Sequence, residues 1–154
     1  MCGLAGELRF DGTPVDIRAL ERMTQHQQRR GPDSFGLSVA PERGFGHRRL
    51  KIMDLSDAAQ QPMVDPLLGL GVVFNGAIYN HAELRKELQA KGYSFYSQGD
   101  TEVLLKAYHA WGERFVERLN GMFAFALWER DSGRVLLGRD RLGIKPLYYA
   151  DVPG

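Results

Sequence analysis

Apolar residues recur at helical spacing near the start of the chain. In residues 16–30, Ile17, Leu20 and Met23 fall on one face of a helix, and the first residue of the run is an aspartate, a type that favours the N-cap. Gly31, followed by proline, ends the run. The pattern predicts an amphipathic surface helix.

Two further stretches predict helices in the middle of the chain. Residues 81–92 carry Leu84 and Leu88 one helical turn apart, and residues 100–112 are apolar over most of their length. Both runs end at a glycine, and the first or second residue of the latter is suited to cap it. We therefore expect two helices here.

Five stretches are typical of strands. They are apolar or alternating runs, several bounded by turn residues, at 47–55, 68–76, 122–129, 134–140 and 145–150. Several of the connections between them are too short for parallel crossovers, and the third and fourth read as a hairpin. Helices interleaved with such strands predict an α+β fold with mostly antiparallel sheets.

Composition limits the class of protein. The 154 residues are 44% hydrophobic and 25% charged, which fits one globular domain, and 20 basic against 19 acidic residues give a net charge of +1. We therefore expect no nucleic-acid partner, no membrane span and a cytoplasmic location. The sequence stops directly after the strand-like residues 145–150, so we expect it to be part of a longer protein.

The one cysteine, Cys2, stands where removal of Met1 would give it a free α-amine. A thiol with a reference pKa of about 8.5 needs a base to attack as a thiolate, and an α-amine with a pKa of about 7.7 to 8.0 can serve. Taken alone, an incidental cysteine is the better interpretation. With one cysteine and four scattered histidines, we expect no metal site.

Four other residues could complete a site around Cys2. Asn75 and Gly76 follow an apolar strand, where a side-chain amide and a backbone N–H can bind one oxyanion, although Asn-Gly also makes an ordinary turn. Arg49 could bind a carboxylate or lie in solvent. Asp100 could bind an ammonium group or cap its helix.

Eight blocks along the whole chain resemble the glutaminase domain of asparagine synthetase-type glutamine amidotransferases, which are class II, N-terminal-nucleophile enzymes. Each block is weak alone, but together and in order they are specific. They are MCG (1–3), RGPD (30–33), GHRRLKIMDLS (46–56), QQPM (60–63), NGAIYN (75–80), GDTEVLLKAY (99–108), NGMFAFALWE (120–129) and GRDRLGIKPLYY (138–149).

The resemblance implies a role for each matching residue. In catalysis, Cys2 matches the nucleophile, and Asn75 and Gly76 match the oxyanion hole. In substrate binding, Arg49 matches the clamp on the carboxylate and Asp100 matches the partner of the ammonium group. Leu50 and Ile52 match residues that line the same pocket.

The resemblance also implies the fold and the partners. It predicts an N-terminal-nucleophile hydrolase sandwich of four αββα layers over residues 1–154. The domain would release ammonia from glutamine without a cofactor and pass it to a C-terminal synthetase domain that uses ATP and Mg²⁺. That domain's SGGxDS phosphate-binding loop is absent from this sequence, and a homodimer is among the assemblies that the resemblance allows.

One position departs from the family pattern. Asparagine synthetases usually read NGEIYN, whereas this chain has Ala77 in place of the glutamate that helps to hold the substrate amine. A small residue here resembles the branch that amidates N-acetylglutaminylglutamine, which we therefore favour as the acceptor. The alternatives are aspartate as the acceptor, or a non-catalytic module that binds glutamine or serves only for docking.

Overall fold

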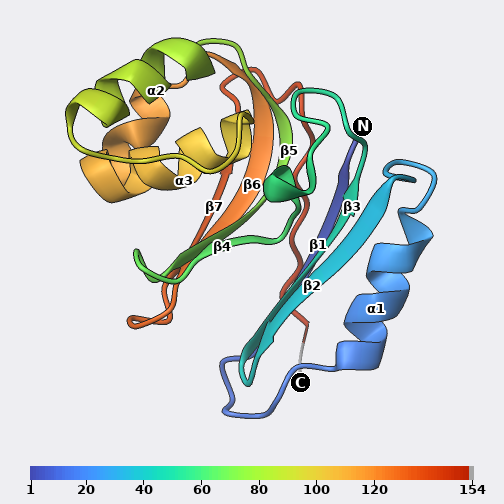
Figure 1. Cartoon of the computed structure of the whole chain (residues 1–154). Helices are drawn as coiled ribbons and strands as arrows, with labels where there is room; N and C mark the ends of the chain where they lie inside the picture. The colour runs from blue at the N-terminus through green and yellow to red at the C-terminus, as the bar shows by residue number, and fades with distance from the viewer. Residues whose placement is uncertain (153–154) are drawn as a thin grey trace.

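Two antiparallel sheets form the centre of the molecule in the computed structural model, which describes residues 1–152 (Figure 1). The first sheet has the strand order β1-β3-β2 and the second has the order β4-β5-β6-β7. The strands of the first sheet are β1 (Gly3–Leu8), β2 (Ser34–Ala40) and β3 (Arg43–Arg49). Those of the second are β4 (Met63–Asp65), β5 (Leu70–Ile78), β6 (Gly121–Glu129) and β7 (Val135–Arg139).

Helices cover the outer face of each sheet. Figure 1 shows α1 (Ile17–His26) outside the first sheet, and α2 (His81–Ala90) and α3 (Asp100–Trp111) outside the second. Two 3₁₀ segments, Asp57–Ala59 and Gly112–Arg118, join these elements. The layers therefore run α-β-β-α, which is the four-layer sandwich expected for an N-terminal-nucleophile hydrolase.

The hydrophobic core consists of two clusters of buried side chains. The larger cluster lies between the second sheet and its helices and includes Phe115, Phe125 and Leu104. A smaller cluster lies between the sheets, where the rings of Phe45 and Trp128 stack with centroids 4.7 Å apart. The smaller contact between the sheets leaves room for polar residues at one end of the interface.

The helix α1 differs from its prediction in the face that it buries. Asp16 caps it as expected, since its carboxylate accepts the Ala19 N–H at 3.0 Å. However, Leu20 and Thr24 are buried, whereas Ile17 and Met23 are largely exposed. The reason is that Leu20 and Thr24 pack where two glycines of β3 carry no side chain, so the helix lies close to the sheet.

Three predicted strands differ from those observed. Residues 47–55 are a strand only as far as Arg49, and 145–150 form no strand. The apolar run 68–76 continues as β5 to Ile78. The strands β1, β2 and β4 were not predicted, because these short or glycine-containing segments depend on pairing partners far along the chain.

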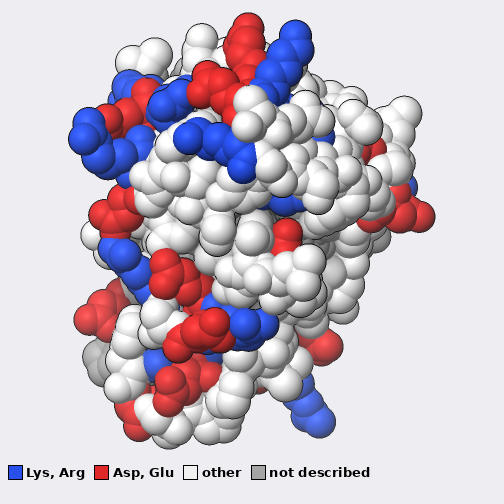
Figure 2. Space-filling view, turned by 60° about the vertical axis from the view of Figure 1, so that its left-hand side comes forward, with Lys and Arg blue, Asp and Glu red and all other residues white. Residues whose placement is uncertain are grey.

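The other predicted elements are confirmed, with glycine stops for α2 and α3 at positive φ and a β6–β7 hairpin. On the face shown in Figure 2, basic and acidic side chains are interspersed. No helix within residues 1–152 is long and apolar enough to cross a bilayer.

Candidate functional site

Cys2 lies directly before β1 and its sulfur rests against the backbone of Leu50. The Leu50 N–H donates to Sγ at 3.4 Å, and the thiol lies 3.7 Å from the Leu50 carbonyl oxygen. Arg30 Nε donates to the Cys2 carbonyl oxygen at 3.3 Å. The pairing of β1 with β3 sets this position, because Gly3 lies opposite Arg48 and brings Cys2 to the end of β3.

The thiol faces a cavity of about 150 Å³ between the two sheets and the start of α3. All seven residues predicted from the sequence line it, although Ile52 is mostly exposed at the rim. They are Cys2, Arg49, Leu50, Ile52, Asn75, Gly76 and Asp100. The fold therefore brings together residues from four separate regions of the chain.

Gly76 presents its N–H to an open edge of β5. The short β4 leaves this edge unpaired beyond Val72. The Phe74 N–H donates there to Gln61 Oε1 at 2.6 Å, and the Ile78 N–H donates to Asp100 Oδ2 at 2.9 Å. Since alternate residues of an antiparallel strand point their N–H groups to the same side, the Gly76 N–H points to this edge too.

Asn75 and Gly76 are not the turn at a strand end that their dipeptide allows, because both lie within β5. A Cβ at Gly76 would collide with the Met122 carbonyl oxygen and lie 2.7 Å from Phe123 Cα, so glycine is required by the close approach of β6. Asn75 is buried, and its carboxamide makes no side-chain hydrogen bond within residues 1–152. Both groups are available to a ligand.

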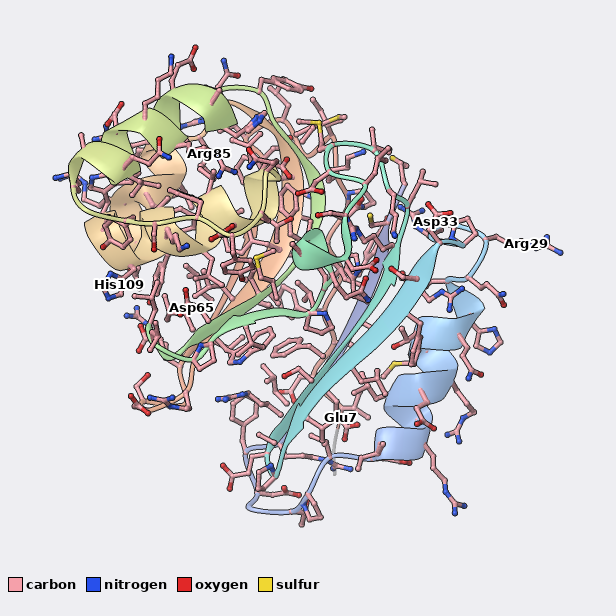
Figure 3. All side chains as sticks on the ribbon, in the orientation of Figure 1. Glu7, Arg29, Asp33, Asp65, Arg85 and His109 are labelled. Atoms are coloured by element: carbon pink, nitrogen blue, oxygen red, sulfur yellow. The ribbon has the colours of Figure 1, made fainter. Side chains whose placement is uncertain are left out.

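Arg49 is a buried guanidinium at the end of β3. Its Nη1 donates to the Ser56 carbonyl oxygen at 2.9 Å and its Nη2 donates to the Asp54 carbonyl oxygen. These bonds curl residues 50–56 back over the cavity, which is why the predicted strand 47–55 ends early. Asp33 (Figure 3) accepts the Lys51 N–H at 2.8 Å and holds the same loop from the other side.

Asp100 is the first residue of α3 and does not cap it. Gly99 occupies the N-cap, and the Asp100 carboxylate accepts the Ile78 N–H of β5. Burial raises the pKa of this carboxyl, and the hydrogen bond from Ile78 partly opposes that rise. Burial of the Asp100 carboxylate at the cavity wall costs free energy. Helix capping does not explain this burial, because Gly99 and not Asp100 is the N-cap residue.

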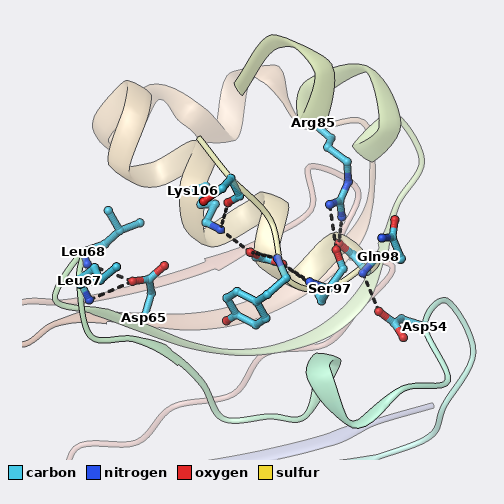
Figure 4. Close-up of polar contacts among 12 residues, drawn as sticks. Asp54, Asp65, Leu67, Leu68, Arg85, Ser97, Gln98 and Lys106 are labelled. Atoms are coloured by element: carbon cyan, nitrogen blue, oxygen red, sulfur yellow. Dashed lines mark hydrogen bonds and ion pairs between the residues drawn. The ribbon is translucent and has the colours of Figure 1, made fainter. Parts of the chain in front are cut away.

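A chain of polar contacts ties the Arg49 loop to the start of α3 (Figure 4). Asp54 Oδ2 accepts the Gln98 N–H at 2.7 Å. Arg85 of α2 donates to the carbonyl oxygens of Ser97 and Gly99 at 2.9 and 2.8 Å. The Arg49 and Asp100 sides of the cavity are thus positioned relative to each other.

The sequence did not identify two residues that support the β5 edge. Besides accepting the Phe74 N–H, Gln61 donates from Nε2 to Thr101 Oγ1 at 3.3 Å. His47 Nε2 lies 3.0 Å from the Phe74 carbonyl oxygen, and burial lowers the pKa of His47 to about 4, so the neutral ring donates this bond. The QQPM and GHRRLKIMDLS blocks contain these residues, but no spacing marked their role.

Three further residues line the cavity wall, and the part of the chain that the structure describes groups no metal ligands there. Ala77, Met1 and Lys145 also line it. Within the described residues no group of three or more His, Cys, Asp or Glu side chains is arranged to hold a metal ion.

Comparison with known proteins identifies the family of this chain. The chain matches the glutamine amidotransferase domain family over residues 1–154. It is 40% identical over 152 residues to asparagine synthetase [glutamine-hydrolyzing] 3 of Bacillus subtilis, covering 97% of this chain and 25% of that protein. It is 37% identical over 150 residues to asparagine synthetase B [glutamine-hydrolyzing] of Escherichia coli, covering 96% and 26% respectively.

A solved structure shows the same fold. The glutamine phosphoribosylpyrophosphate amidotransferase of B. subtilis matches with a TM-score of 0.55 and 19% identity, over 89% of this chain and 31% of that chain. This chain spans about a quarter of the length of the asparagine synthetases that it matches. By sequence and by fold, the chain belongs to the glutamine amidotransferase domain family, in the class II type found in asparagine synthetases.

Proposed function

We propose that this chain hydrolyses glutamine to glutamate and ammonia, with Cys2 as the nucleophile once Met1 has been removed. The observation that carries the proposal is the placement of the Cys2 thiol in one cavity with a buried arginine, a buried aspartate and the open edge of β5. Glutamine offers a carboxylate, an ammonium group and a carboxamide, which match these three features.

The first step is activation of the thiol. Removal of Met1 converts the Cys2 nitrogen from an amide, which is not a base, to a primary amine. The amine accepts the thiol proton, and the thiolate attacks the side-chain carboxamide carbon of glutamine. The Leu50 N–H, 3.4 Å from Sγ, donates to the resulting anionic sulfur.

The second step is stabilisation of the oxyanion. When the C–S bond forms, the carboxamide oxygen takes the electron pair and becomes an anion. The Asn75 Nδ2 group and the Gly76 N–H are the donors that we assign to it. The Cys2 ammonium then returns the proton to the leaving nitrogen, ammonia departs, and water hydrolyses the thioester to release glutamate.

Substrate binding uses the opposite ends of the cavity. Arg49 would bind the α-carboxylate of glutamine, because its planar guanidinium is held in place by backbone carbonyl groups and forms no ion pair with a carboxylate within residues 1–152. Asp100 would bind the α-ammonium group, since only one of its two oxygens is used by the Ile78 N–H.

Ammonia release from glutamine by the chain without Met1 tests the proposal, with mass spectrometry to verify removal. We expect turnover in the wild type and none in Cys2→Ala or in a sample that retains Met1. Wild-type turnover by Cys2→Ala would overturn the assignment. Glutamine binding without ammonia release would favour the non-catalytic docking module instead.

The ammonia acceptor belongs to the larger protein. We propose that a C-terminal synthetase domain, with ATP and Mg²⁺, uses the ammonia to amidate a carboxylate, and we favour N-acetylglutaminylglutamine because Ala77 stands in the cavity wall where asparagine synthetases carry glutamate. The relatives named above support aspartate as the alternative acceptor.

Full-length protein with ATP and glutamine, offered either acceptor, distinguishes the two. Amidated dipeptide would support the favoured acceptor, whereas asparagine would exclude it. We also expect a cytoplasmic location, and a homodimer is an arrangement to test by light scattering.

A further inference from the structure

Two lysines are almost completely buried, each with 4% of its surface exposed, and their surroundings differ. Lys106 donates to the Glu102 carboxylate and to the Ser94 carbonyl oxygen (Figure 4). Lys145 lines the Cys2 cavity, and within the described part of the chain its Nζ is hydrogen-bonded only to the thioether sulfur of Met1, at 2.7 Å. Among residues 1–152, no carboxylate lies within 4.0 Å of Lys145 Nζ.

This environment is costly for an ammonium group. A buried charge is normally paired or hydrogen-bonded to oxygen, and a thioether sulfur is only a weak acceptor. The backbone of Lys145 is nevertheless held firmly, since its N–H donates to Asp140 Oδ2 at 2.9 Å. Removal of Met1 would take away the one side-chain acceptor that Nζ has in the described structure.

We propose that Lys145 is the electrostatic partner of Cys2, and that in the chain without Met1 its ammonium group stabilises the Cys2 thiolate and disfavours the protonated form of the Cys2 amine. This inference rests on the proposed function, because it requires Met1 to be absent. Nζ contacts Met1 Sδ, and the Met1 carbonyl carbon is bonded to the Cys2 nitrogen, so covalent geometry places Nζ within roughly 9 Å of that nitrogen.

The other charged groups around Cys2 are each hydrogen-bonded to backbone groups, whereas the ammonium group of Lys145 contacts only Met1 Sδ among the described residues. The Arg49 and Arg30 guanidinium groups donate to backbone carbonyls, and the carboxylates accept backbone N–H groups. The charged residues that face Cys2 from the neighbouring elements are Arg30, Arg49, Asp54, Asp100 and Lys145.

The effect on Cys2 follows from Coulomb's law. A positive charge lowers the energy of a nearby thiolate and raises that of a nearby ammonium group. Both effects lower the pH at which the thiol–amine pair of Cys2 loses its first proton, and the free enzyme must lose this proton before the thiolate can attack. Lys145 is thus a positioning charge that acts through Cys2, whereas Arg49 and Asp100 act on the substrate.

The single cysteine allows a direct test that does not depend on glutamine. The rate of alkylation by iodoacetamide is measured against pH on chains without Met1, with mass spectrometry to follow the product. In Lys145→Met we expect the midpoint of this profile to rise by about 0.5 to 1.5 pH units, as expected for loss of a unit charge at this distance.

Matched variants separate charge from packing. Lys145→Arg keeps the charge and should retain the wild-type midpoint, and Lys145→Gln should shift it in the same direction as Lys145→Met. Lys91→Met, at an exposed lysine after α2, is the control and should change nothing. Thermal melts identify any variant that fails to fold, and the proposal is then decided on the remaining substitution.

An unchanged midpoint in a folded Lys145→Met or Lys145→Gln variant would overturn the proposal. The acid limb of glutaminase kcat/KM against pH gives the second measurement and should move upward with the alkylation midpoint. If the alkylation midpoint shifts in Lys145→Met but neither the wild type nor any variant releases ammonia from glutamine, the proposed function is rejected and the role of Lys145 is retained.

Discussion

The Asp100→Asn variant tests the proposed ammonium site most sharply, because it changes charge with little change in shape. The replacement can orient its amide oxygen to accept the Ile78 N–H, which the wild-type carboxylate accepts at 2.9 Å. The start of α3 should therefore keep its position. What is lost is the negative charge that would face the ammonium group of glutamine.

The size of the effect follows from the geometry. Two unit charges about 4 Å apart attract by about 4 kcal/mol at an effective dielectric constant of 20, and incomplete desolvation reduces the net value to about 2 to 4 kcal/mol. The glutamine KM should therefore rise by about 30- to 1,000-fold. Because the ammonium group is remote from the reacting carboxamide, kcat should change much less.

The same substitution that weakens glutamine binding should stabilise the folded chain at neutral pH. Burial raises the pKa of Asp100, so the folded state binds more protons than the unfolded state between the two pKa values. The free energy of unfolding then falls as pH rises from the unfolded-state pKa through the folded-state pKa, and the loss persists at neutral pH. Asparagine removes this loss, so Asp100→Asn should unfold at a higher temperature than the wild type at pH 7. Below pH 3, where the wild-type carboxyl is protonated in both states, the variant should have no such advantage.

Steady-state glutaminase assays and thermal melts at the two pH values measure both effects. Asp65→Asn is the matched control, since Asp65 is also buried and accepts the N–H groups of Leu67 and Leu68 at 3.1 Å, outside the cavity. An unchanged KM in Asp100→Asn, or an equal rise in KM in both variants, would refute the proposed ammonium site.

Four further substitutions test the remaining parts of the site, three by steady-state kinetics and one by calorimetry. Asn75→Ala should lower kcat by about 10² to 10³, the cost of one oxyanion donor, and an unchanged kcat would exclude it from the oxyanion hole. Arg49→Lys should raise the glutamine KM by about tenfold or more, since lysine lacks the planar fork, and equal KM values would place the carboxylate elsewhere. Ala77→Glu should tighten glutamine binding by up to about 1.5 to 3 kcal/mol, and weaker binding in calorimetry would contradict this. Gln61→Met should lower kcat more than it raises KM, because the Phe74 N–H loses its acceptor beside the oxyanion hole, whereas Gln61→Glu should restore part of kcat.

The sequence by itself determined the helices and the longest strands. Residues 81–92 and 100–112 combine apolar spacing with glycine stops, and these local signals give α2 and α3 with boundaries close to those observed. The central strands β5 and β6 are long apolar runs, so they too are recognised without a partner. In each case the information lies within one short segment.

The sequence could not predict features that depend on distant partners. The strand β2 exists because it pairs with β3, and the run 145–150 has strand-like residues but forms no strand. Asn75 and Gly76 read locally as a turn, yet pairing with β6 extends the strand through them. The side of α1 that is buried was likewise decided by the glycines of β3 rather than by its own apolar pattern.

The candidate site shows the same division. Residue types and the family resemblance identified the seven predicted residues, and each has chemistry that its side chain carries alone. Only the tertiary structure supplied the single cavity that joins them, the open edge of β5 beyond the short β4, and the buried contact of the Lys145 ammonium group with Met1 Sδ. These are relations between segments up to 144 positions apart, and they arise only when the two sheets pack against each other.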